Sequence, residues 1–240
     1  MLNIFKCINI MSLLPYYSVD NAYEIGVDEA GRGPLFGRVY VAAVILPKGT
    51  PMPLLSKEGF QYPKEFRYDL MRDSKKIKSK KKMRELAEYI KANSVAWSVR
   101  YAEADDIDRN GILNCVIREM HNCIIDLTAT RGFAGGLALI DGNYFKLLSK
   151  WNPETEELDV MPHQTVEKGD GTYASIAAAS ILAKYERDSY IEELCLKVPE
   201  LVTKYKLDTN MGYGTKAHMD GIKEHGVTQW HRVTFRGANL

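Results

Sequence analysis

The sequence has few cysteines, no long apolar run and almost no net charge. Its four cysteines form no C-x-x-C pair, which excludes zinc-ribbon and thioredoxin-type motifs. No apolar run reaches the roughly 18–20 residues that cross a membrane. The 32 basic and 31 acidic residues leave a net charge of +1. This balance does not exclude nucleic acid as a partner, because the distribution of charge matters more than its sum.

The composition is that of an ordinary globular protein. Apolar residues make up 45% and charged residues 26% of the 240, which excludes a disordered chain, a collagen-like repeat and a coiled-coil rod. We expect the cysteines to be packed or free thiols in a reducing compartment. The start of the chain, MLNIFKCINIMSLL, lacks an A-x-A-like cleavage site, so we expect a cytoplasmic protein.

Hydrophobic periodicity predicts strands and helices that alternate after two initial strands. The predicted strands are 23–30, 39–46, 94–102, 136–141 and 160–167, and the predicted helices are 79–92, 104–110, 111–128, 172–196 and 215–225. Residues 1–20 form a loose lead-in, 47–73 a proline-rich irregular excursion and 147–159 an exposed loop. This order predicts one α/β domain over 21–240, with a mixed sheet between helices and a helical C-terminal region.

Four carboxylates lie where a strand or an apolar run ends: Asp28, Glu29, Asp141 and Asp170. Each has an ordinary explanation, because acids are common at strand ends, in Asp-Gly turns and before helices. Acids at the ends of several strands of one sheet would nevertheless converge on one edge, where open α/β sheets place their sites. Together the four acids therefore favour a catalytic cluster over an unrelated strand end and two turns.

Clustered carboxylates repel one another, and a divalent cation removes that cost. Without cysteine or zinc-spaced histidine ligands, Mg²⁺ or Mn²⁺ is the expected ion. Two such ions can clamp the attacking and leaving oxygens of a phosphodiester. Because side chains alternate along a strand, the adjacent Asp28 and Glu29 reach one site only if the pleat ends there. The following loop GRGPLFG, residues 31–37, favours such an end.

A strongly basic run covers residues 72–84, with eight basic residues and one acidic residue. Such a run is often only a solvated helix face. It also suits phosphate contacts that position a nucleic acid without reading its sequence.

Several short motifs, in order along the chain, resemble the ribonuclease HII (type 2 ribonuclease H) family. They are GVDEAGRGP from Gly26, DSKK from Asp73, the helix IDRNGILNCVIREM from Ile107, IDG from Ile140, the block from Glu167 to Asp188, YGTKAH from Tyr213, and His231-Arg232. The resemblance runs from about residue 23 to 236. Residues 1–20 have no counterpart in it, and the loop 146–161 is longer than usual.

The resemblance implies a ribonuclease H-like fold and an endonuclease that cuts the RNA strand of RNA–DNA hybrids. It also implies a cut on the 5′ side of ribonucleotides embedded in duplex DNA, leaving a 3′-hydroxyl and a 5′-phosphate. The family's four catalytic and metal-binding acids fall on Asp28, Glu29, Asp141 and Asp170. We expect two Mg²⁺ or Mn²⁺ ions with substrate bound, and a monomer without membrane contact.

The resemblance also implies residues that bind substrate. The loop Gly31-Arg32-Gly33 would contact the 2′-hydroxyl that distinguishes RNA from DNA, since glycine permits close approach of the backbone. Tyr213 would stack on the neighbouring sugar. Lys75 and Lys76, joined by Ser74, would contact phosphates.

Further candidates and alternatives stay open. Ser180 and Lys184 are candidates for substrate contact. The spacing of His218, His225 and His231 does not match a compact zinc site, and we expect His218 and His231 to be structural or peripheral. One alternative function is a non-catalytic nucleic-acid-binding protein on the same fold. Another is a two-metal phosphoesterase acting on small substrates.

Overall fold

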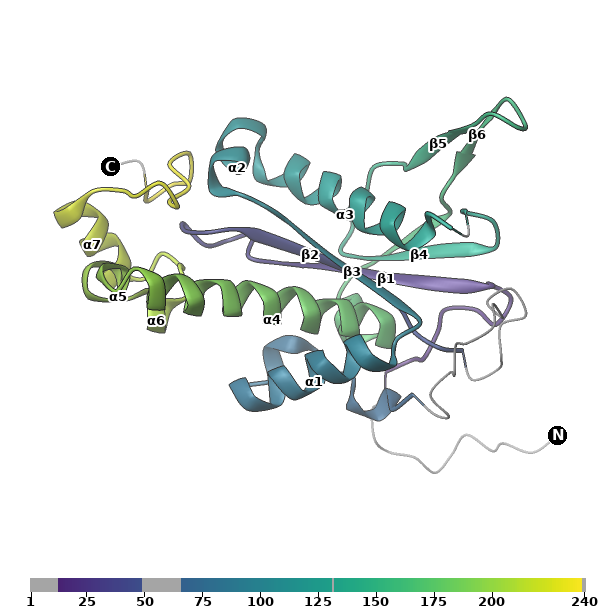
Figure 1. Ribbon diagram of the computed structural model, residues 1–240, viewed down its shortest axis with the longest axis horizontal. Coiled ribbons are helices and arrows are strands. Elements are labelled where there is room, and N and C mark those ends of the chain that lie inside the picture. Colours follow the sequence, from purple (N-terminus) through teal and green to yellow (C-terminus); the bar gives the residue numbers. More distant parts are fainter. Residues whose placement is uncertain (1–12, 49–65, 131, 239–240) are drawn as a thin grey trace.

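A five-stranded mixed sheet forms the centre of the protein (Figure 1). The computed structural model describes residues 13–48, 66–130 and 132–238. The strands run in the order β3-β2-β1-β4-β7. Strand β2 is antiparallel to both β1 and β3, whereas β4 is parallel to both β1 and β7. Their bounds are Tyr23–Ala30 (β1), Val39–Ile45 (β2), Ala96–Ala102 (β3), Gly136–Asp141 (β4) and His163–Val166 (β7).

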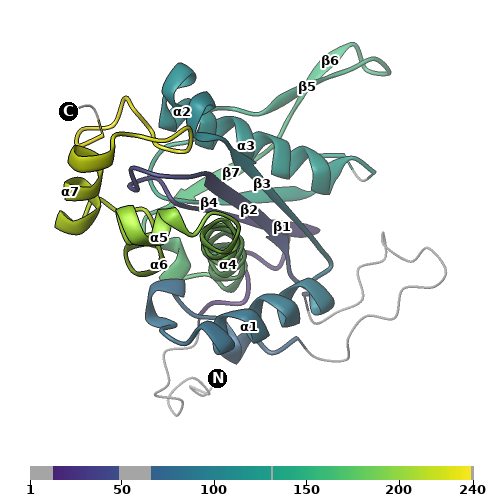
Figure 2. The ribbon, with the colours of Figure 1, turned by 60° about the vertical axis from the view of Figure 1, so that its left-hand side comes forward.

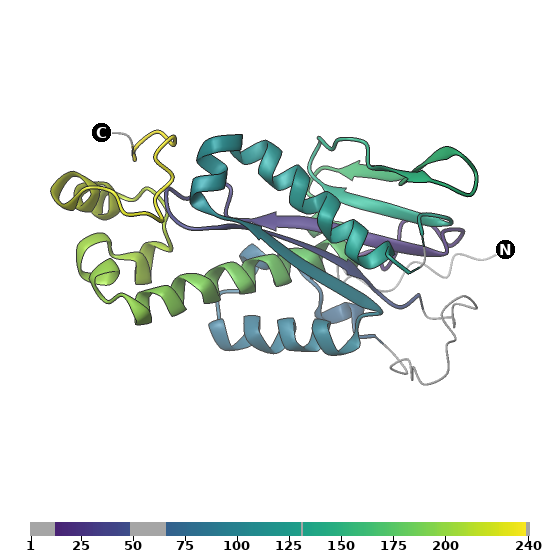
Figure 3. The same cartoon turned by 45° about the horizontal axis from the view of Figure 1, so that its top comes forward.

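Helices cover both faces of the sheet, as predicted. Figure 3 shows α2 and α3 over one face, and α4 on the other with α1 outside it. Figure 2 shows α5, α6 and α7 gathered at one end of α4. The helices are Lys80–Asn93 (α1), Ala104–Asn110 (α2), Ile112–Thr128 (α3), Ala174–Lys197 (α4), Glu200–Tyr205 (α5), Leu207–Asn210 (α6) and Lys216–His225 (α7), with single 3₁₀ turns at Tyr68–Leu70 (η2), Ser74–Lys76 (η3) and Gly169–Gly171 (η4).

Strand β2 has an apolar core on each of its faces. Its odd-numbered residues from Val39 to Ile45 pack in the core beneath α3, and Tyr40, Ala42 and Val44 pack in the core beneath α4 and α1. All seven residues of the strand are buried. The strand predicted at 39–46 is confirmed, and its uninterrupted apolar run is typical of a strand buried on both faces.

Helix α4 lies directly against β1 because Gly26 has no side chain. A Cβ atom at Gly26 would lie 2.1 Å from the carbonyl carbon of Ser175. The small residues of α4 from Ala177 to Ser180 are buried, and the helix packs against β1 on the side that Gly26 faces. This close approach brings the end of β1 next to the α4 side chains that follow.

The exposed loop predicted at 147–159 is wrong in part, because this segment contains a β-hairpin. Strands β5 (Ser149–Asn152) and β6 (Glu157–Val160) pair antiparallel and project from the body in Figure 1. The predicted strand 160–167 correspondingly begins later, at His163. The exposure was predicted correctly, since seven of the eight hairpin residues are exposed.

The lead-in is attached to the fold from residue 13 onward. Leu14 exchanges backbone hydrogen bonds with Thr172 and Ala174, which precede and begin α4. The buried carboxylate of Glu24 accepts hydrogen bonds from the amides of Tyr17 and Ser18. Of the predicted irregular excursion 47–73, residues 49–65 lie outside the described part, as do residues 1–12 of the lead-in.

Two further expectations concern cysteines and membranes. Cys115, Cys123 and Cys195 are buried free thiols, as predicted, and Cys7 lies outside the described residues. No helix in the described part of the chain is long and apolar enough to cross a membrane.

Candidate active site

A pocket of about 490 Å³ opens at the carboxyl ends of β1 and β4. The pairing of these strands stops at Val27 and Ile140, so the sheet is open beyond them. Three of the four predicted acids line the pocket, together with the glycine loop and Tyr213. Its lining residues are Asp28, Glu29, Ala30, Gly31, Arg32, Gly33, Ser74, Lys75, Asp141, Ser180, Lys184, Arg187, Asp188 and Tyr213.

Asp28 and Glu29 reach this pocket although the strand does not end at Asp28. Strand β1 continues to Ala30, paired with β2 alone. Val27 packs on the α3 side, so alternation turns Asp28 toward α4 and Glu29 toward α3. Both reach the pocket because β4 no longer flanks the strand at this height. The expectation that the strand ends at these acids is therefore wrong. Only the pairing of β1 with β4 ends there, and the pairing with β2 continues to Ala30.

Asp28 is a buried carboxylate among other negative groups. It is 5% exposed. Burial raises its pKa well above the usual value, and the charges of Glu29 and Asp141 raise it further. A hydrogen bond from the Ser180 hydroxyl and one from the Glu29 amide at 2.7 Å act in the opposite direction. In the protein alone, the charge on Asp28 is thus incompletely compensated.

The other acids carry partial compensation from basic side chains. Burial raises the pKa of Glu29, opposed by Arg32, whose Nη1 lies 3.1 Å from Oε1. Burial also raises the pKa of Asp170, opposed by Lys75, whose Nζ lies 3.5 Å from Oδ2. Asp170 does not itself line the pocket but borders it through Lys75.

Turn η4 connects the two later acids. The Gly169 amide donates to Oδ1 of Asp141 at 2.7 Å. A Cβ atom at Gly169 would lie 2.5 Å from the Ile176 side chain, so this turn packs tightly against α4. Asp141 is thereby fixed beside the turn that carries Asp170.

The four acids offer carboxylate oxygens, which are the ligands that a hard divalent cation prefers. The buried Oδ2 of Asp170 accepts no well-aligned hydrogen bond from the described residues, and the pKa values of Asp28 and Glu29 are raised. Within the described ranges, no group of three or more His, Cys, Asp or Glu side chains is arranged to hold a metal ion as it stands. Mg²⁺ commonly takes only one or two carboxylates and completes its shell with water and substrate phosphates.

The glycine loop is fixed from behind by Arg232, which is fully buried. Its guanidinium donates to the carbonyls of Arg32, Pro34 and Gly37 at 3.2, 2.9 and 2.9 Å. Gly31 has φ +95°, a conformation that glycine adopts without strain. The loop is therefore built on a buried cation supplied from the far end of the chain.

Tyr213 lines the same pocket as the acids and is half-exposed. Its ring approaches the loop, since a Cβ atom at Gly33 would lie 3.7 Å from Cε1. The guanidinium carbon of Arg187 lies 5.3 Å from the ring centroid. Sequence reasoning missed Arg187, which is buried and contacts both Tyr213 and the Gly31 region. Its place in the block from Glu167 to Asp188 was the available signal.

The remaining predicted residues are placed differently from one another. Ser74 is buried, and its Oγ lies 3.0 Å from Oγ of Ser180. Ser74 thus lines the pocket as a buried residue held by Ser180. Lys184 lines the pocket and pairs with Asp188 at 2.6 Å. Lys76 is exposed and does not line the pocket.

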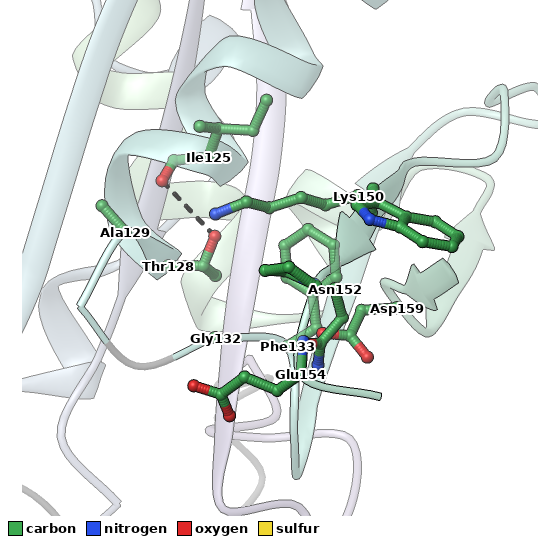
Figure 4. Close-up of a pocket in the computed structure, with 11 residues that line it drawn as sticks. Ile125, Thr128, Ala129, Gly132, Phe133, Lys150, Asn152, Glu154 and Asp159 are labelled. Atoms are coloured by element: carbon green, nitrogen blue, oxygen red, sulfur yellow. Dashed lines mark hydrogen bonds between the residues drawn. The ribbon is translucent and has the colours of Figure 1, made fainter. Parts of the chain in front are cut away.

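A second pocket, of about 260 Å³, separates the end of α3 from the β5–β6 hairpin (Figure 4). Figure 4 shows Lys150 extending toward the last turn of α3, where the Thr128 hydroxyl donates to the Ile125 carbonyl at 3.4 Å. None of the predicted site residues lines this second pocket. The chemistry expected from the acids therefore belongs to the first pocket.

Solved structures with the same architecture are ribonucleases H. Ribonuclease H2 from Pyrococcus horikoshii OT3 matches with a TM-score of 0.64 at 19% identity, covering 90% of this chain and 95% of that one. Bst-RNase HIII in complex with Mn²⁺ matches with a TM-score of 0.61 at 17% identity, covering 90% and 68%. The protein therefore has the ribonuclease H fold, with a mixed sheet flanked by helices, as predicted.

Sequence comparison identifies the family within this class. Residues 25–238 match the sequence model of the family described as Ribonuclease HII. The Ribonuclease HII of Phocaeicola vulgatus is 40% identical over 223 residues, which cover 93% of each chain. The chain belongs to the ribonuclease HII family, whose members are endonucleases of the ribonuclease H type. Family and fold together support ribonuclease activity on RNA–DNA hybrids.

Proposed function

We propose that the protein hydrolyses the RNA strand of RNA–DNA hybrids and cuts on the 5′ side of ribonucleotides embedded in duplex DNA, using two divalent metal ions. The products would be a 3′-hydroxyl and a 5′-phosphate. One observation carries the proposal. A single pocket contains the acids Asp28, Glu29 and Asp141, the glycine loop and Tyr213.

The acids would bind Mg²⁺ or Mn²⁺ when substrate is present. Asp28, Glu29, Asp141 and Asp170 supply the carboxylate oxygens, and the Mn²⁺ complex of Bst-RNase HIII supports a divalent ion. Bound cations would supply activation of water and stabilisation of the leaving oxygen. The Ser180 hydroxyl and the Glu29 amide orient Asp28 by hydrogen bonds to its carboxylate.

The glycine loop would detect the 2′-hydroxyl through its backbone. Because a trans peptide points its C=O and N–H in opposite directions, the Arg32 carbonyl bound to Arg232 turns the Gly33 amide away from that buried side chain. The Pro34 peptide has this geometry, with its carbonyl on Arg232 and the Leu35 amide on the Gly212 carbonyl. We propose that the Gly33 amide faces the substrate.

Tyr213 would select the nucleotide next to the ribonucleotide. Its half-exposed ring lies beside the glycine loop, supported by Arg187. A flat ring stacked on a deoxyribose would crowd a 2′-hydroxyl at that sugar. This contact would favour a junction from RNA to DNA.

A basic groove beside the main pocket would bind the part of the duplex that extends beyond the acids. It has a volume of about 170 Å³, shares Lys184 and Asp188 with the main pocket, and is lined by Lys78, Lys80 and Arg84. Phosphate contacts of this kind position a duplex without reading its sequence. The continuity of groove and pocket favours a long polyanion over a small phosphodiester.

An end-labelled DNA duplex with one ribonucleotide tests the proposal. Wild-type protein with Mg²⁺ or Mn²⁺ should cut it, and an all-DNA duplex or EDTA should abolish cleavage. Asp141→Asn should reduce the rate at least a thousandfold, and Asp159→Asn, an exposed acid of the hairpin, should leave it unchanged.

The alternative functions predict different results. Binding of the duplex without cleavage by any folded preparation would favour the non-catalytic protein. Hydrolysis of a small phosphodiester without cleavage of any duplex would favour the small-substrate phosphoesterase. The cytoplasmic location and the monomeric state stay predictions.

A further inference from the structure

Two buried histidines lie directly behind the turn that carries Tyr213. His218 of α7 is 0% exposed and His231 is 2% exposed. Their Nε2 atoms are 3.1 Å apart. The Nδ1 atom of His218 lies 2.9 Å from the Tyr213 carbonyl. The pair therefore connects the C-terminal segment to the backbone of Tyr213.

The hydrogen bonds fix the proton on each ring. The Thr228 amide can only donate, so Nδ1 of His231, at 2.9 Å from it, is unprotonated. A neutral His231 then carries its proton on Nε2 and donates to Nε2 of His218. The proton of His218 must therefore be on Nδ1, where it donates to the Tyr213 carbonyl. A single arrangement of the two ring protons therefore satisfies all three hydrogen bonds.

The surroundings keep both rings neutral. Burial lowers the pKa of His218, and burial together with His218 lowers the pKa of His231 to about 4. The rings of Tyr205 and Phe36 each lie 5.0 Å from the His231 ring. An added proton would place two N–H groups against each other, either between the histidines or at the Thr228 amide.

The turn that carries Tyr213, held by these hydrogen bonds, also contacts the loop of residues 31–37. The Leu35 amide donates to the Gly212 carbonyl at 2.9 Å, and a Cβ atom at Gly214 would lie 3.1 Å from the Leu35 side chain. Phe36 forms an isolated β-bridge with His231. Both parts of the proposed recognition surface thus rest on the histidine pair.

We infer that His218 and His231 are positioning residues that orient Tyr213 against the glycine loop and thereby set the preference for an RNA-to-DNA junction. The inference rests on the proposed function. It assigns the two histidines a role in substrate selection, acting through the Tyr213 backbone. Neither ring lines the acidic pocket.

Two substitutions at one position separate selection from folding. His218→Gln reaches toward His231 but removes the donor to Tyr213. His218→Asn places an amide nitrogen near the position of Nδ1, so it restores that donor. The matched control is His225→Gln, at the other histidine of α7, which contacts the Tyr205 ring. The assay compares kcat and KM on a single-ribonucleotide duplex and on an all-RNA hybrid.

We expect His218→Gln to lower kcat/KM on the single-ribonucleotide duplex about tenfold, the effect of one lost hydrogen bond. Cleavage of the hybrid should change less than twofold. His218→Asn should recover part of the loss, because it restores the donor to Tyr213 but not the acceptor for His231, and His225→Gln should match wild type. Equal losses on both substrates, or no loss in a folded His218→Gln protein, would overturn the inference.

Nitrogen-15 NMR of the wild-type histidines tests the chain without relying on activity. It should show protonated Nδ1 in His218 and protonated Nε2 in His231 at pH 7. Another tautomer in either ring overturns the inference even if the variants fail to fold. If wild-type protein cuts neither substrate while both tautomers are as expected, the proposed function fails instead.

Discussion

Replacement of Asp28 by asparagine should stabilise the metal-free protein while abolishing cleavage. The carboxylate is buried beside Glu29 and Asp141, and its pKa is raised by burial and by those charges. Asparagine removes the buried charge and both repulsions. It also removes a carboxylate oxygen from the proposed metal site.

The structure predicts no offsetting loss of hydrogen bonds. The asparagine oxygen can accept from the Glu29 amide, now bonded at 2.7 Å, and the amide nitrogen can donate to the Ser180 hydroxyl. Relief of such active-site repulsion is worth about 1–2 kcal/mol. For a chain of this length, that gain raises the melting temperature by about 2–8 °C.

The gain should grow with pH. The raised pKa of Asp28 means that the folded wild-type protein binds more protons than the unfolded chain above about pH 4. Wild-type stability therefore falls as the pH rises through the folded-state pKa, and asparagine abolishes this loss. The advantage should be larger at pH 8 than at pH 5.

Thermal melts in EDTA at both pH values give the measurement, with Asp159→Asn as the control for loss of an exposed acid. Cleavage is assayed separately with Mg²⁺. A melting temperature below that of wild type at pH 8 would refute the electrostatic reasoning. Cleavage at the wild-type rate would refute the role of Asp28 in catalysis.

Three other substitutions test the packing and the proposed contacts. Gly26→Ala places a methyl group 2.1 Å from the Ser175 backbone and should lower the free energy of unfolding in urea by about 3 kcal/mol; an unchanged midpoint would contradict the tight packing of α4 on β1. Lys75→Gln should reduce the slope of log Kd against log salt for duplex binding by about 0.9, whereas an unchanged slope would exclude a phosphate contact. Arg232→Met leaves buried loop carbonyls without a donor and should cost about 3 kcal/mol of stability in the same urea experiment; a variant as stable as wild type would show that the loop holds itself.

The central elements could be predicted because their sequence patterns are long and consistent. The apolar run of β2 predicts a strand buried on both faces. Ser79 precedes α1 and caps it, with its hydroxyl accepting from the Lys82 amide at 3.3 Å. The β5–β6 hairpin was missed because its four-residue strands are exposed and show no buried alternation. Helices α5 and α6, of six and four residues, are too short for periodicity to reveal.

The candidate site divides in the same way. Asp28, Glu29 and Asp141 could be proposed from strand ends and motif resemblance, and the structure brings them to one pocket. The support of the glycine loop by Arg232 joins residues about 200 positions apart, a contact that no local pattern encodes. The pairing of His218 with His231 likewise depends on how α7 packs against the C-terminal segment.

Mapping the cut on a DNA duplex that contains one ribonucleotide is the sharpest test of metal-dependent hydrolysis by this protein. With Mg²⁺ or Mn²⁺, we expect one cut on the 5′ side of the ribonucleotide, leaving a 3′-hydroxyl on one product and a 5′-phosphate on the other. A cut on the 3′ side that leaves a cyclic 2′,3′-phosphate, or cleavage that persists in EDTA, would contradict metal-dependent hydrolysis at the acids of β1 and β4.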